Sequence, residues 1–183
     1  MNKKKYPSLL KLKQDIRRYL TDLDLNLSIK LIFIIDFWPV LLLRLEELTL
    51  ELNRFPGSLL NIVLLFLRPF IQGMSGTRIF NGAQLGEGFL IHTSVGVVIT
   101  AEAVIGTNCT VFSGASVVHS ANNKGEGAAT IGDNVKLMNG CKVIGPVNIG
   151  NNVIVASNAV VLQDIPGNSI AVGIPAVIKV KNS

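Results

Sequence analysis

The sequence has few cysteines, few aromatic residues and little charge. Its 183 residues include two cysteines, aromatic residues make up 6% and charged residues make up 16%. Cys109 and Cys141 form no CxxC pattern and have no histidine or acidic residue at ligand spacing, which argues against a metal site and against a disulfide framework. We therefore expect both cysteines to be small apolar residues in a core, and we expect no bound metal.

Three further features are missing. The start of the chain, Met1–Lys5 followed by polar periodic sequence, lacks the apolar stretch of a signal peptide. No apolar run reaches the roughly 18 uninterrupted residues that are usual for a spanning helix. No surface alternates aromatic with basic residues, so neither DNA nor RNA binding is indicated. We expect a cytoplasmic protein.

The net charge is +5, and much of the positive excess lies near the amino terminus. The cluster comprises Lys3, Lys4, Lys5, Lys11, Lys13, Arg17 and Arg18. Such a cluster suits an anionic membrane surface or a phosphorylated ligand. The alternative is a solvated end that keeps the protein soluble.

The first 72 residues are predicted to be helical. Apolar residues recur at helical spacing between Leu9 and Leu25, and further apolar stretches run over Leu27–Leu43 and Leu59–Ile71. Polar residues and prolines interrupt each stretch. Burial between subunits explains these stretches best, and attachment to a membrane surface is the alternative. Residues 1–72 are therefore interpreted as a helical region for oligomerisation or membrane-surface contact.

From residue 73 to residue 183 the dominant pattern is an aliphatic residue at every sixth position. The aliphatic residues in step are Ile79, Leu85 and Ile91, then Ile99, Ile105, Val111 and Val117, then Ile131, Leu137, Val143, Ile149, Val155 and Val161. A fixed short period indicates a solenoid, and period six indicates a narrow coil whose axis receives the aliphatic side chains. Glycine and asparagine, as at Gly86, Gly132, Asn151 and Asn152, suit its tight corners. The fold class is mainly β, a parallel β-helix behind a helical amino-terminal region.

Several runs carry a family resemblance. The runs TIGDNV, SNAVV and GIPA within Gly127–Ala176, and FLIHTSVGVVI upstream, resemble the serine acetyltransferases among the hexapeptide-repeat acyltransferases. The resemblance implies a left-handed β-helix and a homotrimer or a dimer of trimers, with active sites between neighbouring β-helices. It implies acetyl-CoA or another acyl-CoA as donor, and a hydroxyl or amine of a small molecule as acceptor, L-serine in the parent family.

The resemblance breaks at the catalytic dyad. The family's catalytic histidine falls on Thr93, and its partner carboxylate falls on Arg78. A threonine hydroxyl cannot serve as a general base near neutral pH. His92 lies next to the family position, but adjacent side chains of a strand point to opposite faces, so its use would need a local backbone shift.

The second candidate base is His119. It falls at the end of the family's L-G-G-T run, here Val117–Ser120, whose glycines let CoA approach the backbone. The following excursion, Ala121–Gly127, fits the loop that closes over the site in the family, or else is an exposed turn. Within it, Lys124 matches a family lysine and could meet a CoA phosphate as a point charge.

The resemblance also implies a donor groove along the later coils. The cofactor-binding candidates are Ser120, Lys124, Gly140, Cys141, Ser157, Asn158 and Lys179, with the amides near Gly140, Cys141, Ser157 and Asn158 facing the pantetheine arm. Two positions that are often basic in the family are occupied by Gln163 and Val177 in this sequence. Lys179, two residues after Val177, could supply a positive charge in their place.

Three hypotheses remain open. The first is an active acyl-CoA-dependent O- or N-acyltransferase with a changed base. The second is a catalytically silent scaffold or regulatory homologue of a serine acetyltransferase. The third is a membrane-surface O-acetyltransferase of a glycan, which the apolar helices and the basic start favour.

Overall fold

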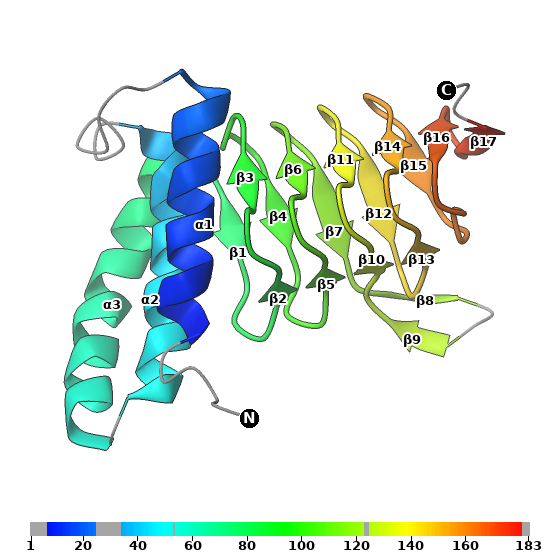
Figure 1. The fold of residues 1–183 in the computed structure, drawn as a ribbon. Helices are drawn as coiled ribbons and strands as arrows, with labels where there is room; N and C mark the ends of the chain where they lie inside the picture. The colour runs from blue at the N-terminus through cyan, green and yellow to red at the C-terminus, as the bar shows by residue number, and fades with distance from the viewer. Residues whose placement is uncertain (1–6, 25–33, 53, 123–124, 181–183) are drawn as a thin grey trace, which may run out of the picture.

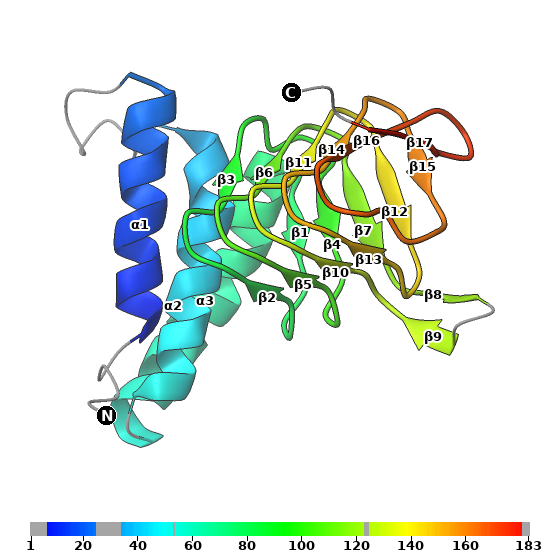
Figure 2. The same ribbon diagram turned by 45° about the vertical axis from the view of Figure 1, so that its right-hand side comes forward.

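The computed structural model describes residues 7–24, 34–52, 54–122 and 125–180. Three helices cover one end of a β-helix, whose coils run away from them (Figures 1 and 2). The helical elements are α1 (Pro7–Asp22), the short 3-10 helix η2 (Ile35–Phe37), α2 (Trp38–Glu51) and α3 (Arg54–Ser75). Residues 27–33 of the second predicted apolar stretch lie outside the described residues.

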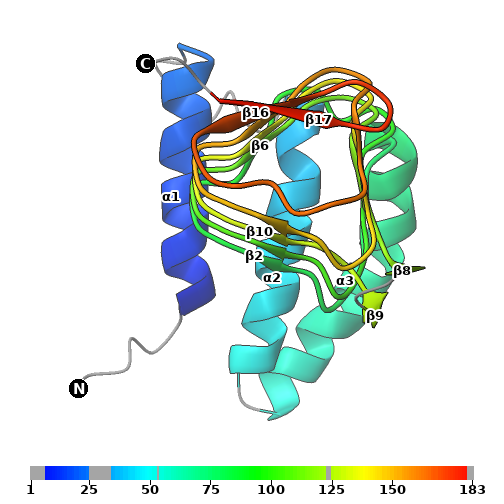
Figure 3. The same ribbon diagram turned by 90° about the vertical axis from the view of Figure 1, so that its right-hand side faces the viewer.

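Successive coils contribute strands to three sheets, which pair parallel from coil to coil and enclose a triangular core (Figure 3). Sheet 1 comprises β1 (Arg78–Ile79), β4 (Val98–Ile99), β7 (Ser116–Val118), β12 (Lys142–Ile144) and β15 (Val160–Val161). Sheet 2 comprises β2 (Gln84–Leu85), β5 (Val104–Ile105), β10 (Thr130–Ile131) and β13 (Asn148–Ile149). Sheet 3 comprises β3 (Leu90–Ile91), β6 (Thr110–Val111), β11 (Lys136–Leu137), β14 (Ile154–Val155), β16 (Ser169–Val172) and the antiparallel β17 (Val177–Val180).

The period-six residues form the core, as predicted. In sheet 1, Ile79 pairs in register with Ile99, and Ile99 pairs with Val117. All thirteen aliphatic residues that the sequence places in step are buried, none more than 8% exposed. Because like residues stack from coil to coil, each coil extends the same apolar column.

The corners use two different devices. Asn152 adopts a left-handed backbone conformation, with φ of 59°, which asparagine tolerates better than most residues. Gly86 has no such φ. A Cβ at Gly86 would lie 2.5 Å from the carbonyl oxygen of Gly106 in the next coil, so glycine is needed there because the coils pass closely.

Both cysteines lie in this core and are free thiols, as predicted for apolar core residues. Cys109 is 1% exposed and Cys141 is 0% exposed. Burial raises the pKa of Cys109 to about 11 and that of Cys141 to about 12. Both thiols are therefore protonated at neutral pH and poor nucleophiles.

Helices α1 and α2 satisfy the backbone groups that the first coil leaves unpaired. The side chain of Asp15 accepts a hydrogen bond from the Phe89 amide (2.8 Å), and the Tyr19 hydroxyl accepts one from the Ile91 amide (2.9 Å). Arg44 donates to the carbonyl oxygens of Leu85 and Gly86 and forms a 2.8 Å ion pair with Asp15. An open sheet edge otherwise invites pairing with other chains, so the helices act as a cap.

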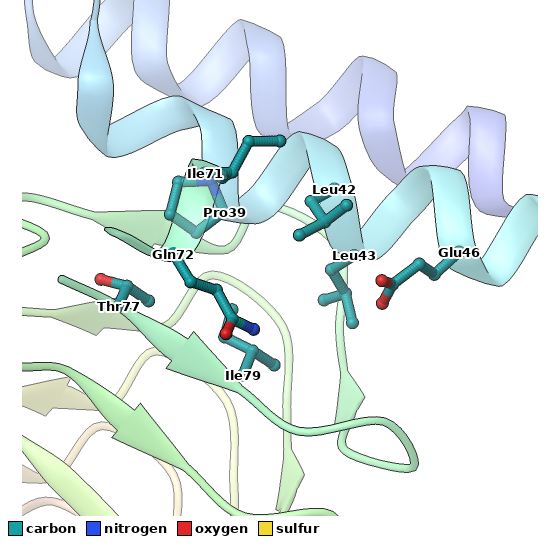
Figure 4. Close-up of a pocket in the computed structure, with 8 residues that line it drawn as sticks. All are labelled: Pro39, Leu42, Leu43, Glu46, Ile71, Gln72, Thr77 and Ile79. Carbon is teal, nitrogen blue, oxygen red and sulfur yellow. The ribbon is translucent and has the colours of Figure 1, made fainter. Parts of the chain in front are cut away.

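Helix α3 packs on the far side of α2. Leu42, Leu64 and Ile71 form a small apolar cluster between the two helices, and Arg68 pairs with Glu46. Where α2 and α3 meet β1, the remaining crevice is lined mainly by apolar side chains and holds no more than a water molecule (Figure 4). It is a packing gap and not a ligand site.

The change from helix to β-helix falls between Ser75, the end of α3, and Arg78, the start of β1. The sequence places this change at residue 73. One continuous apolar core nevertheless runs from Tyr19 and Phe37 in the cap to Ala176 in the last coil. The division into regions 1–72 and 73–183 stays a prediction.

Candidate active site

The predicted site residues gather along the two edges of sheet 1. The chain enters sheet 1 from sheet 3 at one edge, which we call the 3–1 corner, and the turns ending at Gly96, Gly114, Gly140 and Asn158 stack there. The chain leaves sheet 1 for sheet 2 at the opposite edge, the 1–2 corner, where Thr100, His119 and Leu162 follow their strands. Gly114 and His119 are five positions apart along extended chain, which rises about 3.3 Å per residue, so the two edges are about 16 Å apart.

His92 and Thr93 lie at the 3–1 corner, directly after β3. Both are exposed, and the His92 ring stacks on Phe112 of the next coil, with centroids 4.9 Å apart and planes 19° apart. Arg78 is exposed on β1 and lines a small surface hollow with Arg68 and Phe80. Within the described part of the chain, neither His92 nor Thr93 forms an ion pair, so no carboxylate orients an imidazole at this corner.

His119 lies at the 1–2 corner, between β7 and β8 (Ser120–Asn122), with 36% of its side chain exposed. Its Nε2 is 3.4 Å from Oε2 of Glu102 and 3.8 Å from Oε1 of Glu126. Glu102 belongs to the turn between β4 and β5, one coil earlier, and Glu126 belongs to β9 (Gly125–Gly127). The structure therefore brings two carboxylates to one imidazole.

A hairpin positions Glu126. Strands β8 and β9 pair antiparallel, with Ser120 opposite Gly127, and the hairpin projects from the β-helix beside the 1–2 corner (Figures 1 and 2). Ser120 is half-buried at its base. Lys124, the predicted phosphate contact, lies outside the described residues. The predicted excursion from Ala121 to Gly127 is thus a hairpin in its described part.

The donor-site candidates of the later coils lie at the 3–1 corner. The amides of Gly140, Cys141 and Asn158 donate to the carbonyl oxygens of Ser113, Met138 and Asn139. Those amide hydrogens are therefore used inside the protein and do not face a ligand, contrary to the geometry that we expected for the pantetheine arm. Ser157 and Asn158 are exposed, so a contact to a donor would come from their side chains.

A shallow hollow follows the 1–2 corner toward the carboxy terminus. It is lined by Leu162, Gln163, Pro175, Ala176, Val177 and Ile178. Strand β7 pairs with β12 and β12 pairs with β15, so Leu162 lies two strand spacings, about 10 Å, from the level of His119. Lys179 is exposed on β17 beside this hollow. His119 and an apolar depression thus share one edge of the β-helix.

No metal centre emerges from these side chains. Over the described ranges, no three histidine, cysteine, aspartate or glutamate side chains are grouped so that they could hold a metal ion. The chemistry that the arrangement can perform is proton transfer by an imidazole that a carboxylate orients.

A family model described as bacterial transferase hexapeptide (six repeats) matches residues 128–163. A serine acetyltransferase of Synechococcus elongatus is 36% identical over 102 residues, which cover 56% of this chain and 42% of the relative. One of Staphylococcus aureus is 39% identical over 101 residues, which cover 55% of this chain and 47% of the relative. The repeat region of the chain is thus similar in sequence to serine acetyltransferases.

The chain spans less than half the length of these two serine acetyltransferases. A crystal structure of serine acetyltransferase from Brucella abortus in complex with coenzyme A superposes with a TM-score of 0.78, at 20% identity, over 96% of this chain and 68% of that one. At this identity the likeness concerns the fold. It confirms the left-handed β-helix with amino-terminal helices that the repeats and the resemblance predict.

The site residues predicted from the sequence did not include Glu102 or Glu126. A signal for Glu102 was present, because paired positions such as Val98 and Ser116 are 18 residues apart and Glu102 precedes His119 by nearly that interval. Residues one coil apart in a β-helix are stacked neighbours. Glu126 carried no such signal, because its position depends on the β8–β9 hairpin.

Proposed function

We propose that this protein is an acyl-CoA-dependent acyltransferase that uses His119, and not the family's dyad position, as its general base. The observation that supports this is the carboxylate of Glu102 at 3.4 Å from the His119 ring. A base must be oriented, and its cationic form must be stabilised, when it takes a proton from the acceptor. Arg78 and Thr93 provide neither function.

The proposed step is a simple acyl transfer. His119 takes the proton from the hydroxyl or amine of the acceptor, whose oxygen or nitrogen then attacks the thioester carbonyl carbon. The tetrahedral intermediate collapses, the carbon–sulfur bond breaks, and the leaving thiolate receives the proton back from the imidazolium. Glu102 acts as a positioning residue through His119, and Glu126 adds a second carboxylate from the hairpin.

The donor would lie along the 1–2 corner. Its thioester would face His119, and the remainder of the molecule would reach the hollow at Leu162 and Val177, with Lys179 near its phosphates. The exposed Ser157 and Asn158 lie at the opposite edge of sheet 1, about 16 Å across. A homotrimer would bring the 3–1 corner of one copy to the 1–2 corner of another, and we propose that each site is formed in this way.

The test is thiol release from acetyl-CoA, with L-serine and a panel of amino acids, amines and sugars as acceptors. The variants are His119→Ala, His92→Ala and Glu102→Gln. We expect His119→Ala to lower kcat by about 100-fold or more, the usual size of a general-base contribution. His92→Ala is the matched control and should leave turnover within about twofold. Glu102→Gln should lower kcat, by less than His119→Ala, with little change in KM.

The other outcomes are equally specific. If His92→Ala abolishes turnover and His119→Ala does not, the base is His92. If no acceptor supports turnover while calorimetry detects CoA binding, the protein is a silent homologue with a retained donor pocket. That reading is favoured by the loss of the dyad at Thr93 and Arg78. If CoA does not bind either, the fold serves assembly.

A membrane-surface acyltransferase of a glycan is the second candidate. The observation in its favour is the apolar outer face of α3, which leaves large side chains such as Phe66 in solvent. An acyl-CoA donor suits the predicted cytoplasmic location in either case.

A further inference from the structure

The outer face of α3 is apolar and exposed along its whole length. Its large apolar residues with at least 43% exposure are Phe55, Leu59, Ile62, Val63, Leu65, Phe66, Leu67, Phe70 and Met74. Three of them are phenylalanines, which alone leave about 450 Å² in solvent if a free ring exposes about 200 Å². Soluble monomers seldom leave a continuous apolar patch of more than a few hundred Å², so this face requires an occupant.

The shape of the face favours lipid over a second protein. Leu65, Phe66 and Leu67 are consecutive and are 67%, 76% and 43% exposed. Successive helical residues are 100° apart, so the exposed apolar arc covers about 200° of the helix. A flat protein surface contacts an arc of roughly 100°. The acyl chains of a lipid layer are fluid, so they can surround a half-immersed helix and contact the whole exposed arc of about 200°.

The charge near the face is complementary to anionic headgroups. Arg54–Ser75 contains no acidic residue, and its two charged residues are both arginines. Arg68 is paired with Glu46 on the inner side of the helix, so the basic group offered to headgroups is the exposed Arg78, which lies near Phe80 beside the carboxy-terminal half of α3. Basic side chains at the boundary of an apolar helix face reach headgroups while their stems stay in the apolar layer.

Lying in the surface fits the packing better than crossing the membrane. Phe55–Ser75 is long and apolar enough to span a bilayer, and 17% of its apolar window is buried in the protein. Its inner side, however, packs on α2 through Leu64 and Ile71 and holds the Arg68–Glu46 ion pair. Spanning would place that pair in hydrocarbon, which is costly.

We propose that the outer face of α3 docks the protein on an anionic membrane surface as an interfacial helix. The proposal goes beyond acyl transfer, because docking requires neither His119 nor a donor. Interfacial helices bind through apolar area together with attraction to anionic lipids, and the outer face of α3 with the exposed Arg78 supplies both.

The experiment is co-sedimentation of the full chain with vesicles of phosphatidylcholine containing phosphatidylglycerol, and with vesicles of phosphatidylcholine alone. The test variant is Phe66→Ser with Phe70→Ser, at positions whose side chains are 76% and 66% exposed, so the fold should tolerate both changes. The control variant is Ile174→Ser with Val180→Ser, at exposed apolar positions at the far end of the β-helix. Sedimentation velocity without vesicles measures the oligomeric state of all three proteins.

We expect the parent and the control to bind the anionic vesicles and to bind the neutral ones more weakly. The test variant should lose about tenfold or more in partitioning, since two aromatic rings no longer enter the lipid. Absence of parent binding to the anionic vesicles would overturn the proposal. So would a test variant that binds vesicles normally but sediments as a smaller assembly, because a second copy would then cover the face. Neither result depends on turnover.

Discussion

At the residue scale, Gly86 should be intolerant of any side chain. A Cβ there would lie 2.5 Å and 2.6 Å from the carbonyl oxygen and carbon of Gly106, which are backbone atoms of the next coil. Since neighbouring coils cannot separate without breaking their hydrogen bonds, we expect Gly86→Ala to lower the free energy of unfolding by about 1–3 kcal/mol. Urea unfolding followed by circular dichroism measures the change.

The matched control is Gly73→Ala. Gly73 lies in α3, and a Cβ there would meet nothing within 4 Å. Because alanine favours a helix over glycine, this variant should be more stable by about 0.5–1 kcal/mol. Equal effects of the two substitutions would mean that backbone freedom, and not the spacing of the coils, determines where glycine occurs in this chain.

Core residues were the most predictable from the sequence, and site residues the least. Ile79 and Val161 could be assigned to the core because a β-helix repeats one packing rule at every sixth residue. The approach of Glu102 to His119 follows no such rule. It depends on the side-chain conformations of two largely solvent-accessible residues and on a hairpin outside the repeat. Alignment with the family drew attention to Thr93 and His92 instead, where the carboxylate is missing.

At the scale of elements, the cap formed by α1 and α2 rests on one buried ion pair. Arg44 is 1% exposed and Asp15 is 0% exposed, and between them they bond to three backbone groups of the first coil. Arg44→Met would leave a buried carboxylate without its partner. We expect a loss of about 3–5 kcal/mol in the free energy of unfolding at pH 7. Arg17→Met, at an exposed position of α1, should stay within about 0.5 kcal/mol.

This destabilisation should depend on pH in a defined direction. Burial raises the pKa of Asp15 above its ordinary value of 3.8, and Arg44 opposes that rise. Without Arg44 the pKa should rise further, and a carboxyl whose folded pKa is raised loses its contribution to stability as the pH increases through that value. The gap between variant and parent should therefore be smaller at pH 5 than at pH 8. A gap that is constant with pH would indicate lost packing and not a lost charge.

The elements themselves were predictable to different degrees. Periodicity indicated helices in the first 72 residues and strands after them, because both patterns persist over many residues. It did not indicate which side of α3 faces solvent. Both sides of Leu59–Ile71 are apolar, and only the packing of Leu64 and Ile71 on α2 distinguishes them. The β8–β9 hairpin was expected only as an excursion, because Ala121–Gly127 falls outside the period.

At the scale of the whole molecule, the two edges of sheet 1 make a prediction about assembly. His119 lies at one edge, and the exposed Ser157 and Asn158 lie at the other, about 16 Å away. If an active site uses both edges, a trimer can form each site from the 1–2 corner of one copy and the 3–1 corner of its neighbour. Two variants that are inactive for different reasons should then restore each other.

The pair to mix is His119→Ala, which lacks the proposed base, and Ser157→Trp, whose indole would block the proposed donor contact. Each should be inactive alone. Co-expression in equal amounts with different tags gives mixed trimers, in which one of the three interfaces combines an intact His119 with an intact Ser157. We expect turnover near one third of the parent value in trimers that carry both tags. If both residues served the same site within one copy, every mixed trimer would stay inactive, because no chain in it would carry both intact groups.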